Sequence, residues 1–315
     1  MVSDSDFSVA NPFRRFKVRY VLLRLVIGMA IALIVFSTVL AIALPISFLE
    51  ALDLQALEER SFWLSQLYFV GVTGIGLLVV GLGCRKHQIR LKQLIGPITP
   101  DLPWKLTLGL AIASQLCLMG FYRVGNALLT YWAPDLVLTA VNQNTNELTE
   151  ALAASSSPLL FISLIWLLGF YQNVIAKLLI FGLVLHRWSY KWGLSWAVGV
   201  NLGIAALANL PSLGLALSAI AFSLIEILLY LKTRSLAPPI VHALAAAAIG
   251  YGLVFIDNGL TVSSLTPVNY TLADLRSQAT LGYLYLVLGL PWLIAFIYRH
   301  WPPSAVKLPY FANAE

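Results

Sequence analysis

Apolar stretches of membrane-spanning length recur along the whole chain. A helix needs about 20 mostly apolar residues to cross a bilayer, because its backbone must be hydrogen bonded within the segment. Only 11% of the residues are charged, against roughly a quarter in soluble domains. The sequence therefore predicts an all-α, polytopic membrane helix bundle of about eight transmembrane helices. The expected spans are Val21–Leu44, Trp63–Gly83, Leu106–Tyr122, Leu159–Leu185, Trp196–Leu210, Leu213–Leu231, Pro239–Phe255 and Leu281–Tyr298.

The distribution of basic residues predicts the orientation of the bundle. Lys and Arg near span ends are retained on the cytoplasmic side. They occupy alternate intervals between the spans, and the other intervals hold only Arg60 and Arg276 together with most of the acidic residues. We expect both termini to be cytoplasmic. An outer segment, 136–157, carries a polar run and then a stretch compatible with a helix at the outer surface.

The composition excludes several classes of function. The formal net charge of +6 is spread over short loops rather than gathered in one stripe, so we expect no nucleic-acid partner. Cys84 and Cys117 both lie at or inside spans, which leaves neither a disulfide framework nor a cysteine metal site. The N-terminus lacks the short apolar stretch and cleavage site of a signal peptide.

Three ionisable residues inside the spans are the first candidates for function. Each such group costs about 2.5–3.5 kcal/mol on insertion. Lys177, Glu226 and His242 lie at depths of very roughly 15, 9 and 12 Å, counted from the nearest cytoplasmic basic residues at a helical rise of about 1.5 Å. Asn201 falls at a similar depth. We expect one polar cluster in the cytoplasmic half of the bundle, with Lys177 and Glu226 paired.

One segment resembles a known family. The residues Leu228–Leu231, Lys232–Leu236 and Pro238–Leu244 resemble the third conserved segment of the CPBP family, the intramembrane metalloproteases related to CAAX prenyl protease 2 and to lysostaphin-resistance proteins. That segment has a leucine-tyrosine run, a basic-Thr-Gly-Ser-Leu turn, and then a proline and a histidine opening a helix. The resemblance implies that His242 occupies the place of a catalytic histidine.

Two further segments extend the resemblance over roughly residues 158–251. Asn209 to Ser212 is similar to the His-Leu-Pro-Asn end of the family's second motif, and Gln172 to Lys177 to its first motif, two glutamates followed by arginine. The implied organisation is a tail at 1–19, spans one to three with an outer loop at 20–157, a CPBP-like core of spans four to seven at 158–256, and a last loop, span and cytoplasmic tail at 257–315.

The chain departs from the family pattern where the chemistry resides. Gln172 and Asn173 replace the paired glutamates, Lys177 the arginine, Asn209 the first histidine, and Ala246 the last asparagine. An alternative alignment puts Ala176 and Lys177 at the glutamate positions and Phe181 at the arginine. A carboxamide takes up no proton and binds no hard cation as a carboxylate does. One imidazole does not supply the roughly three protein ligands of catalytic zinc, so no metal ligands are assigned.

The sequence therefore predicts a catalytically inactive, CPBP-like scaffold, assembly or interaction subunit. It has no cofactor, and its partners are the lipid bilayer and another membrane protein. One alternative is a CAAX-type intramembrane metalloendopeptidase whose divergent site uses Glu226 and His242, with zinc only in that case. A carrier or channel with Lys177, Glu226 and His242 as a relay ranks last, since no internal repeat is present. The expected location is a prokaryotic cytoplasmic or internal membrane, crossed several times.

Overall fold

The computed structural model describes the central and C-terminal parts of the chain most fully. The described residues are 11–16, 18–20, 23–24, 26–28, 30–31, 34, 71, 74–153, 169–170, 173–210, 212–257, 269–303 and 307–314, without the side chains of 15, 144–153, 251 and 253–257. Every element in this part of the chain is helical. The predicted all-α class is thus confirmed over the described residues.

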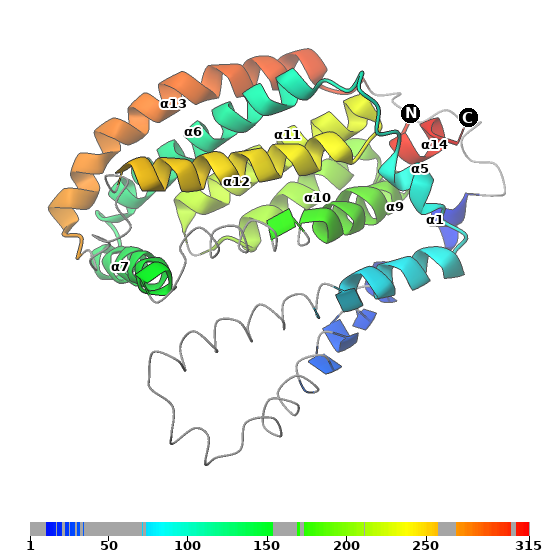
Figure 1. Ribbon diagram of the computed structural model, residues 1–315, viewed down its shortest axis with the longest axis horizontal. Coiled ribbons are helices and arrows are strands. Elements are labelled where there is room, and N and C mark those ends of the chain that lie inside the picture. Colours follow the sequence, from blue (N-terminus) through cyan, green and yellow to red (C-terminus); the bar gives the residue numbers. More distant parts are fainter. Residues whose placement is uncertain are drawn as a thin grey trace.

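The helices are arranged as an elongated bundle (Figure 1). Their bounds are α1 (Pro12–Arg15), α5 (Leu91–Ile95), α6 (Trp104–Leu129), α7 (Pro134–Ala153), the π-helix η2 (Leu178–Val184), α9 (Leu185–Trp192), α10 (Leu194–Leu207), α11 (Leu213–Thr233), α12 (Ala237–Asp257), α13 (Leu272–His300) and α14 (Pro309–Ala312). The described part of the expected outer segment, residues 136–153, lies in α7, which includes the polar run. Residues 74–86 are also helical.

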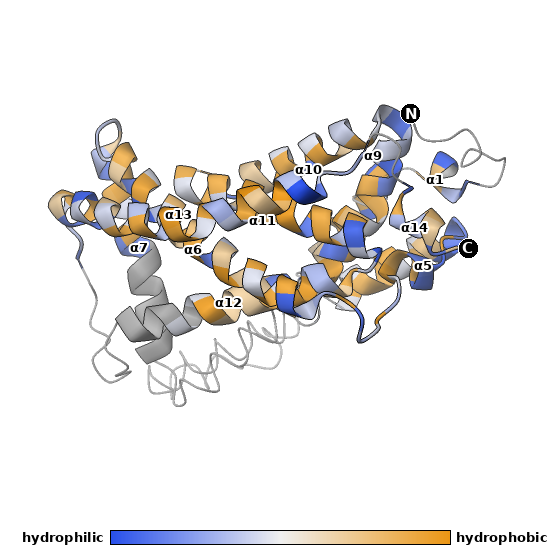
Figure 2. Cartoon of the chain, turned by 90° about the horizontal axis from the view of Figure 1, so that it is seen from above, coloured by the Kyte–Doolittle hydropathy of each residue, from blue (hydrophilic) through white to orange (hydrophobic). Residues whose placement is uncertain are grey.

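Three described helices, α6, α11 and α13, are long and apolar enough to cross a membrane. They contain the predicted spans Leu106–Tyr122, Leu213–Leu231 and Leu281–Tyr298. In the most apolar 18-residue stretch of α11, half of the residues are buried in the protein. In the corresponding stretch of α13, only 22% are buried. The apolar side chains exposed along α13 therefore need lipid as their solvent, while α11 lies inside the bundle (Figure 2).

The other predicted spans coincide with described helices in part, or lie partly outside the described residues. Pro239–Phe255 lies within α12. Trp196–Leu210 coincides largely with α10, which ends at Leu207, three residues earlier than predicted. Leu210 precedes Pro211 in the sequence, and a residue before proline disfavours the helical conformation. Most of Val21–Leu44, and about half of Trp63–Gly83 and of Leu159–Leu185, lie outside the described residues.

Glycines allow α6 and α13 to approach closely. A Cβ atom at Gly289 would lie 2.6 Å from the carbonyl oxygen of Ala113, and one at Gly120 would lie 2.9 Å from that of Gly282. A Cβ at Gly214 would lie 2.5 Å from the carbonyl oxygen of Phe121, so α11 also contacts α6 closely. In lipid the hydrophobic effect does not drive helices together, so they associate through close packing of this kind.

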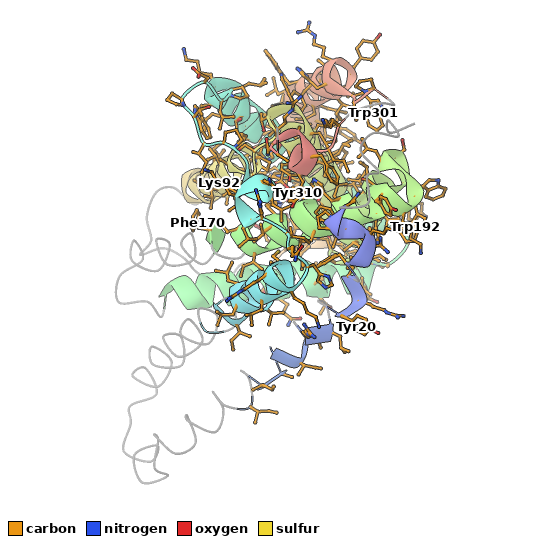
Figure 3. All side chains as sticks on the ribbon, turned by 90° about the vertical axis from the view of Figure 1, so that its right-hand side faces the viewer. Tyr20, Lys92, Phe170, Trp192, Trp301 and Tyr310 are labelled. Carbon is orange, nitrogen blue, oxygen red and sulfur yellow. The ribbon has the colours of Figure 1, made fainter. Side chains whose placement is uncertain are left out.

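An aromatic cluster holds the two ends of the described chain together. The ring of Phe13 in α1 stacks on His186 in α9 at 5.2 Å and contacts the ring of Tyr310 in α14 at 5.0 Å. Arg187 Nη1 donates to the carbonyl oxygen of Phe13 at 2.8 Å. Figure 3 looks onto this end of the molecule, with Tyr310 near its centre. The segments nearest the two termini therefore share one end of the bundle.

His186 is a fully buried, neutral part of this cluster. Its Nδ1–H donates to the carbonyl oxygen of Phe181 at 3.0 Å, and its Nε2 accepts from the backbone N–H of Tyr310 at 3.1 Å. Burial lowers the pKa of His186 from 6.5 to about 4, against the opposing effect of carbonyl groups. A proton on Nε2 would face the N–H of Tyr310 and remove the bond that holds α14.

Acidification should therefore destabilise the protein through His186. Because its pKa is lower in the folded state, the unfolded state binds more protons between about pH 4 and 6.5. The contribution of neutral His186 to the free energy of unfolding is complete above about pH 6.5. It falls by roughly 3 kcal/mol as the pH drops to about 4. Thermal unfolding in detergent should show a flatter profile in this range for His186→Gln than for the partly exposed control His87→Gln. Identical profiles would contradict this role.

Candidate functional site

Four polar side chains from separate helical segments form a continuous chain inside the bundle. Ser114 Oγ on α6 lies 3.0 Å from His242 Nε2 on α12, and His242 Nδ1 lies 3.4 Å from Glu226 Oε1 on α11. The other carboxylate oxygen, Glu226 Oε2, accepts from Nζ of Lys177, just before η2. We refer to Ser114, His242, Glu226 and Lys177 as the polar chain.

The polar chain is closed to its surroundings. Ser114 and His242 have no exposed surface, and the side chains of Glu226 and Lys177 are 2% and 13% exposed. The ring of Phe222 packs on His242 at 5.4 Å, and the ring of Phe181 lies 5.0 Å from Lys177 Nζ. A buried carboxylate is very costly without a partner, so the lysine and the imidazole N–H are what make Glu226 tolerable here.

Each polar atom in the chain has a defined role. Lysine only donates, so both oxygens of Glu226 accept, one from Lys177 and one from the Nδ1–H of His242. Nε2 of His242 then accepts from the hydroxyl of Ser114. The 3.4 Å contact is longer than an optimal N–H···O bond and is the weakest link. The arrangement uses the imidazole as a connector between α6 and α11.

Local structure places Glu226 and His242 opposite each other. The chain reverses between α11 and α12 through a short turn in which Arg234 adopts a left-handed conformation with φ 55°. Helix α5 holds this turn, because its Ile95 carbonyl accepts from the N–H of Leu236 at 2.8 Å and its Leu94 carbonyl accepts from the hydroxyl of Tyr230 at 3.0 Å. A Cβ at Gly96 would lie 1.9 Å from the Arg234 carbonyl oxygen, so only glycine permits this approach.

The π-helix η2 begins directly after Lys177. A π-turn adds a residue per turn and rotates the side chains beyond it, and such insertions are frequent at functional positions. Lys177 is the last residue before this change of register. Its pairing with Glu226, predicted from the estimated depths of the two residues, is present in the structure. His242 is buried rather than directed to lipid.

The two described amides of the motif bond the backbone of their own segments. Asn173 Nδ2 donates to the carbonyl oxygen of Gly169 at 2.8 Å, and Asn209 Nδ2 to that of Ala205 at 2.8 Å. Neither amide is hydrogen bonded to His242 in the described part of the chain. Gln172 lies outside the described residues. Ala246, one turn after His242 on α12, is buried and offers no polar atom.

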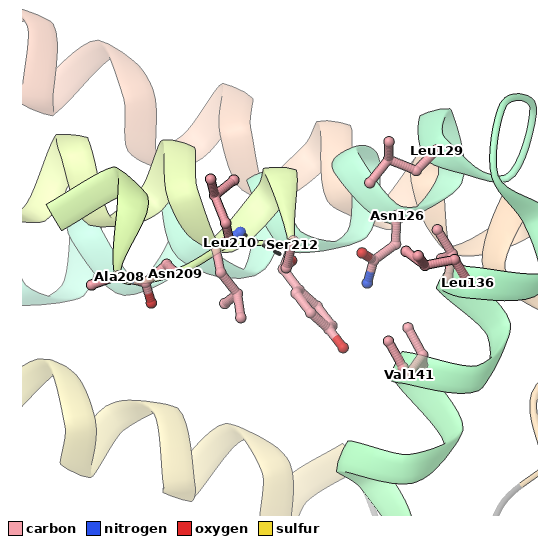
Figure 4. A pocket seen from close by; sticks show the side chains of 12 residues that line it. Asn126, Leu129, Leu136, Val141, Ala208, Asn209, Leu210 and Ser212 are labelled. Carbon is pink, nitrogen blue, oxygen red and sulfur yellow. Dashed lines mark hydrogen bonds between the residues drawn. The ribbon is translucent and has the colours of Figure 1, made fainter. Parts of the chain in front are cut away.

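Asn209 borders a different cavity, between α6, α7 and the segment joining α10 to α11. Its volume is about 260 Å³, and Asn126 and Ser212 add polar groups to a mainly apolar lining. Figure 4 shows Asn209 on one side of this cavity, across from Leu136 and Val141. The end position of Asn209, just past α10, places it here. Asn201, expected at the depth of the cluster, instead donates to the carbonyl oxygen of Ala197 at 2.7 Å.

Ser114 is the member of the polar chain that the sequence did not reveal. A single serine in an apolar helix can bond its own backbone and so carries little signal. The adjacent Gln115 was the available clue, because two consecutive polar residues in an apolar span imply a polar neighbour. Gln115 is also buried, and a Cβ at Gly250 of α12 would lie 2.5 Å from its Nε2. Both residues therefore face α12.

The order Ser114, His242 and Glu226 matches the contacts of a serine-hydrolase triad. Only the order of the contacts matches such a triad. A nucleophile must be reachable and needs free N–H donors for the oxyanion, whereas Ser114 is fully buried in the middle of α6, where helix hydrogen bonds occupy the backbone N–H groups. In this conformation Ser114 is therefore not placed to act as a nucleophile.

The described residues bring together no group of three or more His, Cys, Asp or Glu side chains. Glu226 and His242 are the one carboxylate and imidazole of the polar chain, and the carboxylate is already paired with Lys177. Comparisons of this chain with protein families, with curated proteins and with solved structures found no match. The chemistry must therefore be argued from the geometry of the polar chain.

The Lys177–Glu226 pair should show strong energetic coupling. Each single change, Lys177→Met or Glu226→Gln, should lower the free energy of unfolding, because it leaves the other group buried without its partner. The double variant should cost less than the sum of the single variants by about 0.5–3 kcal/mol, measured by unfolding in detergent. The matched cycle of the exposed Lys191→Met with Glu226→Gln should be additive. Additivity in both cycles would refute the coupling.

Proposed function

We propose that this chain is a catalytically inactive, CPBP-like integral membrane protein that serves as a scaffold, assembly or interaction subunit. The observation that carries the proposal is the closed polar chain. Lys177, Glu226 and His242, the ionisable residues expected inside the membrane, direct their polar atoms at one another and at Ser114. Groups arranged in this way stabilise a helix bundle and leave none of themselves for a substrate.

We propose that the chain crosses a prokaryotic cytoplasmic or internal membrane about eight times and that both termini are cytoplasmic. The contact between Phe13 and Tyr310 supports a common side for the two ends. Basic residues gather at the same end, among them Arg14, Arg187 and Arg90, whose backbone N–H lies 3.4 Å from the Tyr310 hydroxyl. This distribution agrees with the retention of basic residues in the cytoplasm.

The turn between α11 and α12 supports the family resemblance. Arg234 stands where the family pattern has glycine, and its backbone has a φ of 55°. Glycine adopts this conformation without strain, whereas other residues do so less readily. A turn retained after its glycine was replaced would have this property. The same segment then opens α12 with Pro238 and Pro239, which are tolerated in a first helical turn.

The alternative is a CAAX-type intramembrane metalloendopeptidase with a divergent site. The 3.4 Å contact between Glu226 and His242 favours it, since a carboxylate and an imidazole are the usual acid and base. Such an enzyme would have to release Glu226 from Lys177 and recruit further ligands for zinc. The scaffold proposal requires no such rearrangement, and this is why we prefer it.

Metal content separates the two proposals without knowledge of a substrate. The purified full chain, washed free of loosely bound ions, should contain far less than about half an equivalent of zinc, since genuine zinc sites are well occupied. His242→Gln should leave the value unchanged. More than about half an equivalent in the wild type, lost in His242→Gln, would support the metalloendopeptidase and contradict the scaffold.

A further inference from the structure

A groove between α6 and α13 has the dimensions of one membrane leaflet. Its volume is about 640 Å³. Its lining extends from Lys105 to Leu116 on α6 and from Leu288 to His300 on α13, a stretch of about twelve residues on each helix. At about 1.5 Å per residue this is roughly 16 Å, close to the 15 Å or so of hydrocarbon in one leaflet.

The groove is apolar along its length and cationic at one end. Between its ends it is lined by aliphatic and aromatic side chains that include Ile112 and Trp292. Lys105, Arg299 and His300 lie together at the end where α6 begins and α13 ends. No acidic residue from the described part of the chain lines the groove. Among the described residues, neither Lys105 nor Arg299 takes part in an ion pair.

A further cation reaches this end through His300. Nζ of Lys232 on α11 donates to His300 Nε2, while the His300 Nδ1–H donates to the carbonyl oxygen of Phe296 at 3.0 Å. The first turn of α6 receives no side-chain hydrogen bond from its N-cap residue, Pro103. A helix start favours an anion, and this one adjoins lysine and arginine side chains.

We infer that this groove binds one anionic glycerophospholipid of the cytoplasmic leaflet. The phosphate group lies between Lys105 and Arg299, and an acyl chain runs along the apolar lining past Ile112. A lipid fits better than an apolar helix of a partner protein. The cationic end of the groove is complementary to an anionic headgroup, and the apolar lining, about one leaflet long, is complementary to an acyl chain. The inference rests on the proposed membrane orientation and not on the absence of catalysis.

Lipid retention tests the site with the full chain. The protein is taken from vesicles of phosphatidylglycerol and phosphatidylcholine in equal parts, and its bound lipids are identified by native mass spectrometry. The wild type should retain one phosphatidylglycerol in preference to phosphatidylcholine. The variant Lys105→Gln/Arg299→Gln should retain it at least about tenfold less, since each basic residue contributes about fivefold near an anionic surface. The matched control Arg85→Gln/Lys86→Gln, also exposed at the predicted cytoplasmic side, should change retention by less than about twofold.

A second variant tests the apolar part of the groove. Ile112→Trp keeps every cation but fills the groove, and it should reduce phosphatidylglycerol retention while thermal unfolding stays cooperative. Equal retention of both lipids by the wild type, equal losses in the two charge variants, or unchanged retention in Ile112→Trp would each overturn the inference. A bound protein in place of lipid would do so as well. None of these outcomes depends on the zinc content, so the lipid site and the proposed function can fail separately.

Discussion

The carboxylate of Glu226 sets the main physical constraint on this bundle. It lies in the middle of an apolar helix and is almost fully buried. Its charge is acceptable there only while Lys177 and His242 contact it, and these residues come from two other segments of the chain. The hydroxyl of Ser114 extends the same requirement to α6. One buried charge thereby fixes the relative positions of four helical segments, which apolar packing in lipid specifies less strictly.

Other features of the fold support this arrangement. Helix α5 holds the turn that places α12 against α11, and the glycines of α6, α11 and α13 let those three helices pack closely. At the basic end, His186 connects α9 to α14. A polar connection whose groups bond one another is consistent with the proposed scaffold role. An enzyme of this kind would need a carboxylate free to accept a proton or a metal.

Hydropathy and charge in the sequence predicted a large part of the structure. They identified the spans within α6, α11 and α13, and the pairing of Lys177 with Glu226, because a lone charge in lipid has few alternatives. Ser114 was not predicted, since a serine in a helix can satisfy itself. The end of the fifth span was placed three residues too far, and the π-helix after Lys177 was not foreseen, because both depend on backbone hydrogen bonding rather than on apolar pattern. The motif resemblance grouped Asn209 with His242, but helix ends placed Asn209 beside another cavity.

Accessibility of the position of Ser114 tests most directly whether the polar chain is a structural connection. Cysteine can be placed there as Ser114→Cys in a background carrying Cys84→Ala and Cys117→Ala, and treated with a small membrane-permeant maleimide. The closed polar chain predicts no labelling until the protein is unfolded, whereas Ser277→Cys, at an exposed position on α13, should label at once. Labelling of Ser114→Cys in the folded protein at a rate near that of Ser277→Cys would show an open site and contradict the structural role.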